Sequence, residues 1–315
     1  MSTDQAQLCE QLEGVFLPMF TPFEAGGAAV NEPQLRRHAQ FLIESGVRIL
    51  NPAGTSGEFW TLSADEHRLV LRTVLEQCTA TCPESLVVAG VTGRHLSETV
   101  ELACFAAEHG ARVLLIAPSY YLPLSEEDLV EYYRKVAASV DAAIMLYDLP
   151  IATGVRLEGD VVGRICDACP QVIALKTALP LDSPRGFERL MRRYGQRLRI
   201  FSGMGVYFSP FVYMTGAAGI TDTLGNAVPE FGLTLHQLAQ DRQWEEMNRL
   251  YQQAFEVLEI EMLYGKAGLK QIGNSCGRSV GPTRYPLGDV LTAAARKDIE
   301  ERLDRWSFGS GPIAH

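Results

Sequence analysis

The sequence predicts an α/β fold, a (β/α)8 TIM barrel followed by a C-terminal helical extension. Apolar runs of strand length alternate with helical segments, and eight such pairs fit within about 230 residues, which is the number and spacing of this barrel. The first run is followed by FTPFEAGG, which lacks the glycine-rich phosphate loop of an open doubly wound sheet. A chain of 315 residues that is 47% hydrophobic can bury the core of such a barrel.

The predicted strands are short apolar runs, and helical segments are expected between them. In chain order the strands are expected at residues 14–20, 48–52, 86–91, 112–118, 143–150, 172–178, 198–203 and 217–221. Helices are expected at residues 31–44, 63–78, 97–109, 125–140, 159–166, 207–215 and 229–239. The helix at Ser63 opens with SADE, a capping-box pattern, and Gly46 and Gly110 are placed to end the helices before them.

The domain organisation follows from the absence of linker-like or low-complexity stretches before residue 240. Residues 1–240 are predicted to form the barrel. Residues 241–306 are expected to be helical and amphipathic, and to cover the barrel flank or build a contact between subunits. The tail 307–315, SFGSGPIAH, is predicted to be disordered.

Composition excludes several classes of protein. The net charge of −10 and the absence of a basic run argue against nucleic acid or an anionic membrane as a partner. No apolar run is long enough for a membrane span, and the polar N-terminus does not resemble a secretory signal. Seven scattered cysteines fit reduced thiols better than a disulfide framework. We therefore expect a cytoplasmic protein.

Lys176 and Tyr147 are the reactive side chains that end two of the predicted strands. With period-2 alternation, Tyr147 shares a face with Met145 and Ala143, whereas Lys176 shares one with Ala174 and Val172. A lysine in such a run either extends to solvent at the strand end or is held away from water for chemistry. Position alone leaves both interpretations open. A desolvated amine is the nucleophile that Schiff-base formation with a ketone requires.

The other predicted strand ends supply hydroxyl groups and a glycine-flanked turn. In a TIM barrel the chemistry lies at the C-terminal ends of the strands. The residues there are Thr21, 54–58, Gly90, 119–121, Tyr147, Lys176, Ser202, Gly203, Thr221 and Asp222. They include no metal-type cluster of His, Cys and carboxylates and no phosphate cradle, so we expect neither a metal nor a cofactor. The set indicates covalent carbonyl chemistry.

Seven motifs together resemble one family of barrel enzymes. FTPF, AGTSGE, APSYYLP, LYDLPIATG, IALKTA, FSG and GAAGITDTLGN, in this order, resemble the dihydrodipicolinate synthase and N-acetylneuraminate lyase family. The resemblance covers about residues 14–229, and the helical tail also suits the family. It implies a class I enzyme that forms a Schiff base with a 2-oxo acid such as pyruvate, and a homotetramer made of two tight dimers.

The resemblance also implies roles for individual residues. Lys176 corresponds to the Schiff-base lysine and Tyr147 to the tyrosine that moves protons beside it. Thr55 and Ser56 correspond to the pair that binds the carboxylate of the oxo acid, and Thr55 can pass protons to Tyr147. Gly203 and Thr221 are further candidates for substrate binding.

A second tyrosine completes the proton relay in the family, reaching across a dimer contact. Counting from Pro118 favours Tyr120 for this role. Counting back from Tyr147 favours Tyr121 instead, because this chain carries one extra residue between them.

Two departures from the family pattern bear on the substrate. The synthase branch has a carboxylate-binding arginine where this chain has Ala152, and Arg156 is displaced along the chain. Condensation with aspartate semialdehyde is therefore not expected, and PIATG is similar to the version in 2-keto-3-deoxygluconate-type aldolases. The sialic-acid lyase branch has acidic residues after SG, whereas this chain has residues 204–207, MGVY. The substrate tail is expected to be short, apolar or aromatic.

The expected reaction is aldol cleavage or formation of a C–C bond, with pyruvate as product or donor. A 2-keto-3-deoxy acid dehydratase would use the same lysine and is the first alternative. A non-catalytic small-molecule-binding barrel is the second, although the presence of Lys176, Tyr147 and Thr55 together argues against it.

Five further residues have structural interpretations beside functional ones. Glu58 is expected to cap a helix or brace the GTSGE turn rather than to catalyse. Cys166 and Cys169 form CDAC, where a plain thiol pair is favoured over a zinc or redox site. Asp148 and Asp222 are either supports of the site or structural residues.

Overall fold

The chain folds around a closed barrel of eight parallel strands that follow one another in chain order. A computed structural model describes residues 3–120, 122, 124–157, 159–178, 183–287 and 291–306. Strand β8 pairs back to β1, with Phe16 opposite Thr221, and this pairing closes the barrel. The predicted TIM barrel and its C-terminal helical extension are confirmed. The predicted disordered tail, 307–315, lies outside the described residues.

The elements have the following bounds. The strands are β1 Gly14–Pro18, β2 Ile49–Asn51, β3 Leu86–Gly90, β4 Val113–Ile116, β5 Ala143–Asp148, β6 Val172–Thr177, β7 Arg199–Ser202 and β8 Gly219–Thr221. The helices are α1 Thr3–Gln11, α2 Glu32–Glu44, α3 Ala64–Thr81, α4 Leu96–Glu108, α5 Glu126–Ala137, α6 Pro150–Thr153, α7 Asp160–Ala168, α9 Pro184–Tyr194, α10 Ser209–Met214, α11 Pro229–Gln240, α12 Trp244–Gln253, α13 Phe255–Ser275 and α14 Ala293–Arg305. Short 3-10 turns are η1 Ala25–Gly27, η2 Phe59–Thr61 and η3 Leu224–Asn226.

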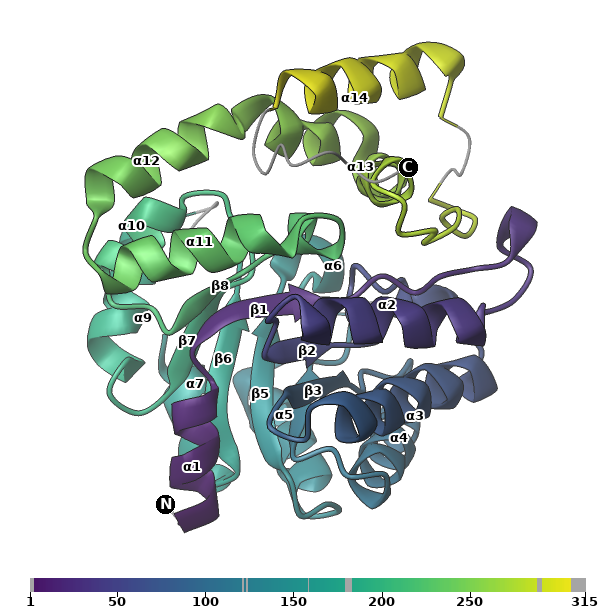
Figure 1. The fold of residues 1–315 in the computed structure, drawn as a ribbon. Coiled ribbons are helices and arrows are strands. Elements are labelled where there is room, and N and C mark those ends of the chain that lie inside the picture. The colour runs from purple at the N-terminus through teal and green to yellow at the C-terminus, as the bar shows by residue number, and fades with distance from the viewer. Residues whose placement is uncertain are drawn as a thin grey trace. The chain divides into compact units, whose positions relative to one another are not determined.

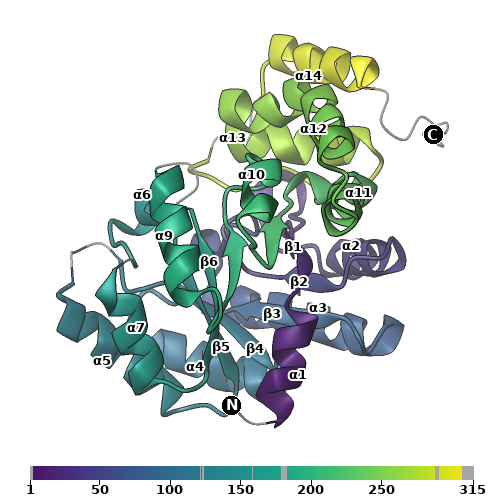
Figure 2. The same cartoon turned by 90° about the vertical axis from the view of Figure 1, so that its left-hand side faces the viewer.

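Internal contacts divide the chain into two compact units. The first comprises residues 1–16, 49–51 and 86–221, and holds the strands with α4, α5, α7 and α9 around them (Figure 1). The second comprises residues 17–48, 52–85 and 222–315, and within it α12, α13 and α14 pack together (Figure 2). The predicted division at residue 240 between barrel and helical region stays a prediction.

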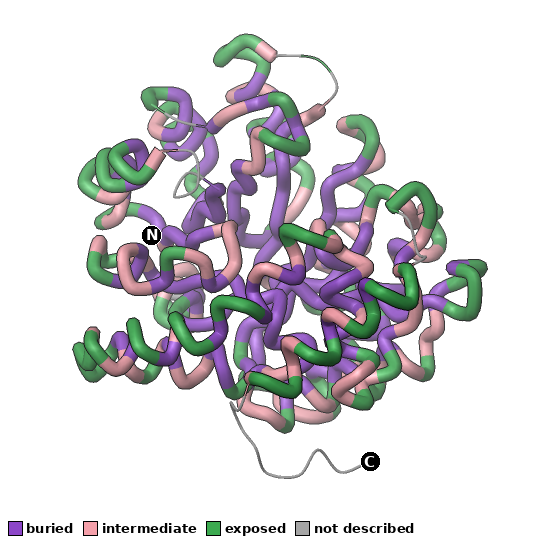
Figure 3. The backbone as a smooth tube through the Cα atoms, turned by 90° about the horizontal axis from the view of Figure 1, so that it is seen from above, coloured by how far each residue is buried: buried purple, intermediate pink, exposed green. Residues whose placement is uncertain are grey.

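The strands are buried because both of their faces are covered. With the exception of Arg199, every strand residue from β1 to β8 is buried, as expected for parallel strands that read as continuous apolar runs. The helices instead alternate between buried and exposed colours along their length (Figure 3), which is the amphipathic pattern of helices that pack on a core.

One irregularity corrects the expected alternation in β6. The pairing of β5 with β6 shifts between Ile144 and Met145. As a result Ile173 and Ala174 both lie in the interior apolar cluster, while Val172 does not. The expectation that Val172 shares the face of Lys176 is therefore wrong, because a bulge inserts one residue and reverses the facing of everything before it.

Helix ends agree with the capping signals in the sequence. The Ser63 side chain accepts from the Glu66 N–H and the Glu66 carboxylate accepts from the Ser63 N–H, so the predicted capping box is confirmed. Gly46 and Gly110 follow α2 and α4 with φ of 96° and 95°, in the left-handed region where glycine is unstrained.

Helices α1, α6 and α9 are absent from the sequence-based assignment. Helix α9 fills the interval between β6 and β7, begins at Pro184 and is capped by Ser183. Helix α1 is anchored by Leu8, which joins Leu12 in the interior cluster of the barrel. Helix α9 places Phe187, Leu190, Met191 and Tyr194 at i, i+3, i+4 and i+7, an amphipathic pattern that the sequence-based assignment passed over. No helix in the described part of the chain has the length and apolarity needed to cross a membrane.

Asn226 is fully buried, and its side chain hydrogen-bonds to several separate segments of the second unit. Its Oδ1 accepts from the Phe20 N–H at 2.8 Å and from His38 Nε2 at 2.9 Å. Its Nδ2 donates to the carbonyl oxygens of Pro18 and Thr223 at 3.0 and 2.9 Å. Burial lowers the pKa of His38 to about 4, so at neutral pH the imidazole is uncharged.

We expect Asn226→Ala to lower the free energy of unfolding by about 2–4 kcal/mol, because it leaves buried donors and acceptors without partners. Denaturant titration measures this as a fall in midpoint at unchanged slope. Gln40→Ala, at an exposed position of α2, serves as the control and should change stability by no more than about 0.5 kcal/mol. Equal effects of the two substitutions would contradict this role of Asn226.

Candidate active site

Lys176 and Tyr147 lie opposite each other on neighbouring strands. The register of β5 and β6 pairs Tyr147 with Lys176 and Asp148 with Thr177. Lys176 is 2% exposed and Tyr147 is 5% exposed. The Lys176 Nζ lies 4.5 Å from the centroid of the Tyr147 ring. The lysine therefore does not extend into solvent. Of the two interpretations left open by its position in the sequence, the one in which it is held away from water is the one that agrees with the structure.

A second aromatic ring lies beside this amine. The Lys176 Nζ also lies 4.9 Å from the centroid of the Phe16 ring. Phe16 in turn packs against Phe201, with ring centroids 5.7 Å apart. Sequence reasoning did not assign Phe16 or Phe201 to the site, although both sit in predicted strands, and alternation alone does not show which apolar residues surround the lysine.

Asp148 and Thr177 lock the strand ends that carry the pair. The Thr177 hydroxyl donates to Asp148 Oδ2 at 2.8 Å, and both residues are fully buried. Asp148 Oδ1 accepts from the Leu157 N–H at 2.9 Å. Because adjacent residues of a strand point to opposite faces, this bond behind the sheet holds Tyr147 and Lys176 in register in front of it. Asp148 is thus a support of the site.

Gly203 and Thr221 shape the neighbouring strand ends. The Gly203 N–H donates to the Thr177 carbonyl at 2.6 Å, and a Cβ on Gly203 would come within 3.1 Å of that oxygen. The Thr221 hydroxyl donates to the Ser202 carbonyl and accepts from the Gly205 N–H, each at 2.9 Å. Their predicted part in substrate binding stays a prediction, since these contacts are to backbone.

The turn that carries Thr55 and Ser56 is tightly wound in the second unit. Thr55 is half-buried and Ser56 is 5% exposed. Within the turn the Gly57 N–H donates to the Gly54 carbonyl and the Glu58 N–H to the Thr55 carbonyl.

Residues with positive φ bracket this turn. Ala53 and Glu58 adopt φ of 52° and 57°. Left-handed backbone at residues other than glycine costs about 1–3 kcal/mol each and persists where surrounding contacts enforce it. Strained backbone of this kind clusters at functional sites.

Glu58 braces the turn rather than capping a helix with its side chain. Its carboxylate is fully buried, and Oε1 lies 2.6 Å from the Nζ of Lys270. Oε2 accepts from the Arg284 N–H at 2.8 Å. The predicted bracing role agrees with these contacts. Neither Lys270 nor Arg284 was predicted from the sequence. For Lys270, the periodicity of α13 does not distinguish a buried lysine from one on the polar face of the helix.

Tyr120 is half-buried in the segment after β4. Burial raises the pKa of its phenol, Glu98 adds to that rise and Arg94 opposes it. The neighbours are therefore charged groups at the start of α4, and the relay role of Tyr120 stays a prediction. The alternative, Tyr121, lies outside the described residues.

The position at which the synthase branch carries an arginine holds an alanine in this chain. Ala152 is exposed in α6. Arg156 is half-buried and lines a hollow of about 240 Å³ with Glu126 and Leu129 of α5. The described part of the first unit thus places Arg156 against an outer helix, which does not favour it as a replacement for the missing arginine.

The two cysteines of CDAC are buried thiols. Burial raises the pKa of Cys166 to about 11 and also raises that of Cys169. Metal binding and redox exchange both use the thiolate, so the plain thiol pair is favoured. Among the described residues, no group of three or more His, Cys, Asp or Glu side chains is placed to hold a metal ion.

Asp222 is buried next to two glycines. Its Oδ1 accepts from the Gly225 N–H at 3.0 Å, and a Cβ on Gly232 would collide with Oδ2. Burial raises the pKa of this carboxyl to about 7, against hydrogen bonds from backbone N–H groups that lower it. A packed, partly protonated carboxyl of this kind supports the loop after β8.

Comparison with known proteins agrees with this geometry. Residues 11–304 match the model of the dihydrodipicolinate synthetase family. A 4-hydroxy-tetrahydrodipicolinate synthase of Methanothrix thermoacetophila is 31% identical over 279 residues, which cover 88% of this chain and 91% of the relative. A crystal structure of a dihydrodipicolinate synthase has a TM-score of 0.85 at 27% identity, covering 93% of this chain and 98% of that chain.

The likeness of fold extends to a second solved structure. A structure of CdNal from Clostridium difficile in complex with mannosamine has a TM-score of 0.85 at 22% identity. It covers 93% of this chain and 99% of that chain, and at this identity the likeness concerns the fold alone.

The TIM barrel and the match over residues 11–304 place the chain in a family of class I, Schiff-base-forming lyases. The chain belongs to the dihydrodipicolinate synthetase family. It is an enzyme of that class, and the predicted membership is confirmed. Enzymes of this family act on small substrates such as pyruvate through a lysine Schiff base and need no external cofactor.

We expect Thr177→Val to lower the free energy of unfolding by about 2–3 kcal/mol, because it leaves a buried carboxylate oxygen of Asp148 without its donor. Thr73→Val is the matched control, since the buried hydroxyl of Thr73 makes no hydrogen bond to the described residues. Its effect should stay within about 0.5 kcal/mol. Denaturant midpoints measure both, and a neutral Thr177→Val would contradict the proposed lock.

Asp222 gives a pH dependence of defined sign. Because its pKa in the folded protein is about 7 against an ordinary 3.8, the carboxyl stabilises the fold relative to Asp222→Asn most strongly below pH 4. This advantage is lost as the pH rises toward 7, by an amount on the order of 4 kcal/mol. Unfolding free energies of both proteins at pH 4 and pH 7.5 measure it. A difference that is constant or grows with pH would refute the assignment.

Proposed function

We propose that the protein is a Schiff-base-dependent aldolase that cleaves or forms a C–C bond of a 2-oxo acid, with pyruvate as product or donor. The observation that carries the proposal is the buried Nζ of Lys176, 4.5 Å from the Tyr147 ring centroid and held in register by the bond between Thr177 and Asp148. An amine buried beside the Tyr147 and Phe16 rings is placed to attack a ketone.

The reaction proceeds through the amine of Lys176. Nζ attacks C2 of the oxo acid, and loss of water gives an iminium. In cleavage, the C3–C4 bond breaks, its electron pair passes to the iminium as an enamine, and the C4 hydroxyl loses its proton as the aldehyde forms. Protonation at C3 and hydrolysis then release pyruvate and restore the amine. Tyr147 moves the protons of these steps, with Thr55 and Tyr120 as further members of the relay.

Substrate binding is assigned to the turn and to the strand ends. Thr55 and Ser56 hold the carboxylate of the oxo acid through hydroxyl and backbone N–H groups, which donate hydrogen bonds without adding charge. Gly203 and Thr221 line the same end of the barrel strands. The proposed site uses no cofactor and no metal, because the iminium formed on Lys176 is the electron sink.

The part of the substrate beyond the oxo acid is inferred from positions where other branches of the family carry charged residues and this chain carries uncharged ones. Ala152 offers no cation for a second carboxylate, and Met204 and Tyr207 offer little to a polyol. We therefore propose an acceptor that is short, apolar or aromatic, and not aspartate semialdehyde. The relatives named as synthases share the first half-reaction with this proposal.

The assembly and location of the enzyme remain predictions from the family resemblance and composition. We propose a homotetramer, built as a dimer of dimers, in the cytoplasm.

We expect the parent protein to gain one covalent adduct when it is incubated with pyruvate and sodium borohydride, because borohydride reduces the iminium to a stable amine. Intact mass spectrometry measures the adduct, and Lys176→Ala should show none. Lys135→Ala, which removes an exposed lysine of α5, should label like the parent.

Two outcomes would count against this proposal. Labelling that persists in Lys176→Ala would place the reactive amine elsewhere. A parent protein that forms no adduct with pyruvate or with larger 2-oxo acids would leave a barrel that binds without chemistry. Among active substrates, the products separate the aldolase from a dehydratase, since only the aldolase releases an aldehyde.

A further inference from the structure

We propose that Lys270 is a positioning residue for substrate binding. From helix α13 it holds the turn 54–58 in the shape that receives the carboxylate of the oxo acid. This inference rests on the proposed function, because it takes from it that Thr55 and Ser56 bind that carboxylate.

The Lys270 ammonium is fixed at one point by several contacts. The side chain is 2% exposed. Its Nζ donates to the carbonyl oxygens of Thr21 and Pro282, both at 2.9 Å, and lies 2.6 Å from the Glu58 carboxylate. It also lies 4.4 Å from the centroid of the Phe23 ring. Two hydrogen bonds and one ion pair therefore hold the ammonium at this point.

Two consecutive residues of the turn are reached through these contacts. Glu58 is bound directly. Gly57 is bound through Thr21, whose hydroxyl donates to the Gly57 carbonyl at 2.7 Å while its own carbonyl accepts from Lys270. A Cβ on Gly57 would come within 3.1 Å of the Met19 carbonyl, so the turn is also packed closely from behind. Any displacement of Lys270 is therefore transmitted to the backbone beside Ser56.

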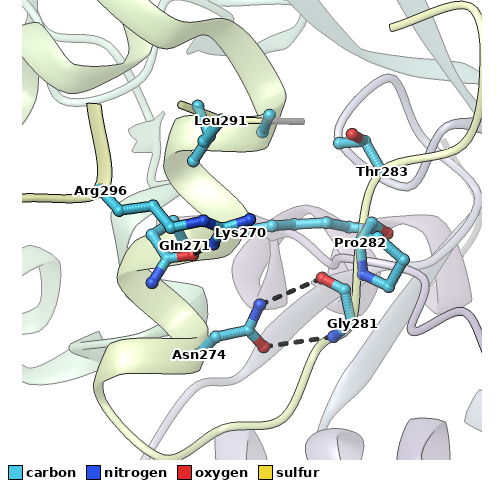
Figure 4. Close-up of a pocket in the computed structure, with 9 residues that line it drawn as sticks. Lys270, Gln271, Asn274, Gly281, Pro282, Thr283, Leu291 and Arg296 are labelled. Atoms are coloured by element: carbon cyan, nitrogen blue, oxygen red, sulfur yellow. Dashed lines mark hydrogen bonds between the residues drawn. The ribbon is translucent and has the colours of Figure 1, made fainter. Parts of the chain in front are cut away.

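A clamp from the C-terminal region holds Lys270 and Glu58 together. Asn274, one turn after Lys270 on α13, exchanges two hydrogen bonds with Gly281 (Figure 4). This places Pro282 against the Lys270 Nζ and brings the Arg284 N–H to Glu58. Figure 4 also shows the Lys270 side chain reaching from α13 toward Pro282, along a hollow of about 240 Å³.

The charge of Lys270 is set by this environment. Burial lowers its pKa to about 8, Glu58 raises it and Arg284 lowers it further. The positive charge of Lys270 also contributes to the lowered pKa of His38. Arg296 lines the same hollow as Lys270. Above pH 8 the amine loses its proton, and Glu58 then lacks its buried cation. The brace is thus expected to weaken in mildly alkaline solution.

The test measures pyruvate dependence of borohydride trapping on Lys176. Lys270→Met keeps the length of the stem but removes the charge, and Glu58→Gln with Lys270→Met removes both charges, so that no carboxylate is left buried alone. Lys266→Met is the matched control, because it removes another lysine of α13 that pairs with Glu261 and not with the turn. Each protein is first checked for folding by circular dichroism.

We expect the half-saturating pyruvate concentration to rise at least about tenfold in the single and double variants, while the limiting rate of adduct formation changes less than about threefold. Lys266→Met should match the parent. In the parent, half-saturation should rise above pH 8 more steeply than in the double variant, which lacks the titrating amine. Should Lys270→Met fail to fold, the double variant carries the test.

Each remaining outcome decides between the two proposals. Unchanged half-saturation in the folded double variant, or an equal rise in Lys266→Met, would overturn the positioning role while leaving the Schiff-base function intact. A fall in limiting rate without a change in half-saturation would overturn it as well. Absence of any adduct in the parent would instead refute the proposed function itself.

Discussion

The pairing of β5 with β6 is the constraint on which the rest of the site depends. Parallel strands of a closed barrel present residues of equal register to the same end. Tyr147 and Lys176 therefore meet only if this register is kept, because a slip of one residue in either strand would turn the reactive side chain of that strand to the other face. The bulge at Ile144 and Met145 lies before the pair, and the bond between Thr177 and Asp148 closes the register after it.

Lys176 and Lys270 are both buried, and their printed contacts differ. The faces of Phe16 and Tyr147 lie beside the Lys176 Nζ. Lys270 has a carboxylate and two carbonyl oxygens within hydrogen-bond distance of its Nζ. In the proposed mechanism the first lysine is a nucleophile, whereas the second is a fixed cation.

Buried ion pairs contribute little net stability, because the desolvation of two charges offsets their attraction. The ion pair of Glu58 and Lys270 is better understood as fixing the conformation of the backbone. The pair holds a turn bracketed by left-handed backbone at Ala53 and Glu58, which would otherwise relax.

The sequence by itself determined the barrel, its strand order and the residue types at the strand ends. Periods of two and of 3.6 residues are local properties, so apolar runs and capping patterns such as SADE at Ser63 can be read without knowledge of packing. Lys176 and Tyr147 were identifiable for the same reason, because each stands as the one reactive group at the end of an apolar strand.

Only the tertiary structure decided which distant residues meet. The bulge that moves Ile173 inward depends on the neighbouring strand. The contact of Lys270 with Glu58 joins segments far apart in the chain, and neither residue carries a local sign of the other. Such contacts are fixed by closure of the fold, because burial and pairing are properties of the whole packed chain and not of any window of its sequence.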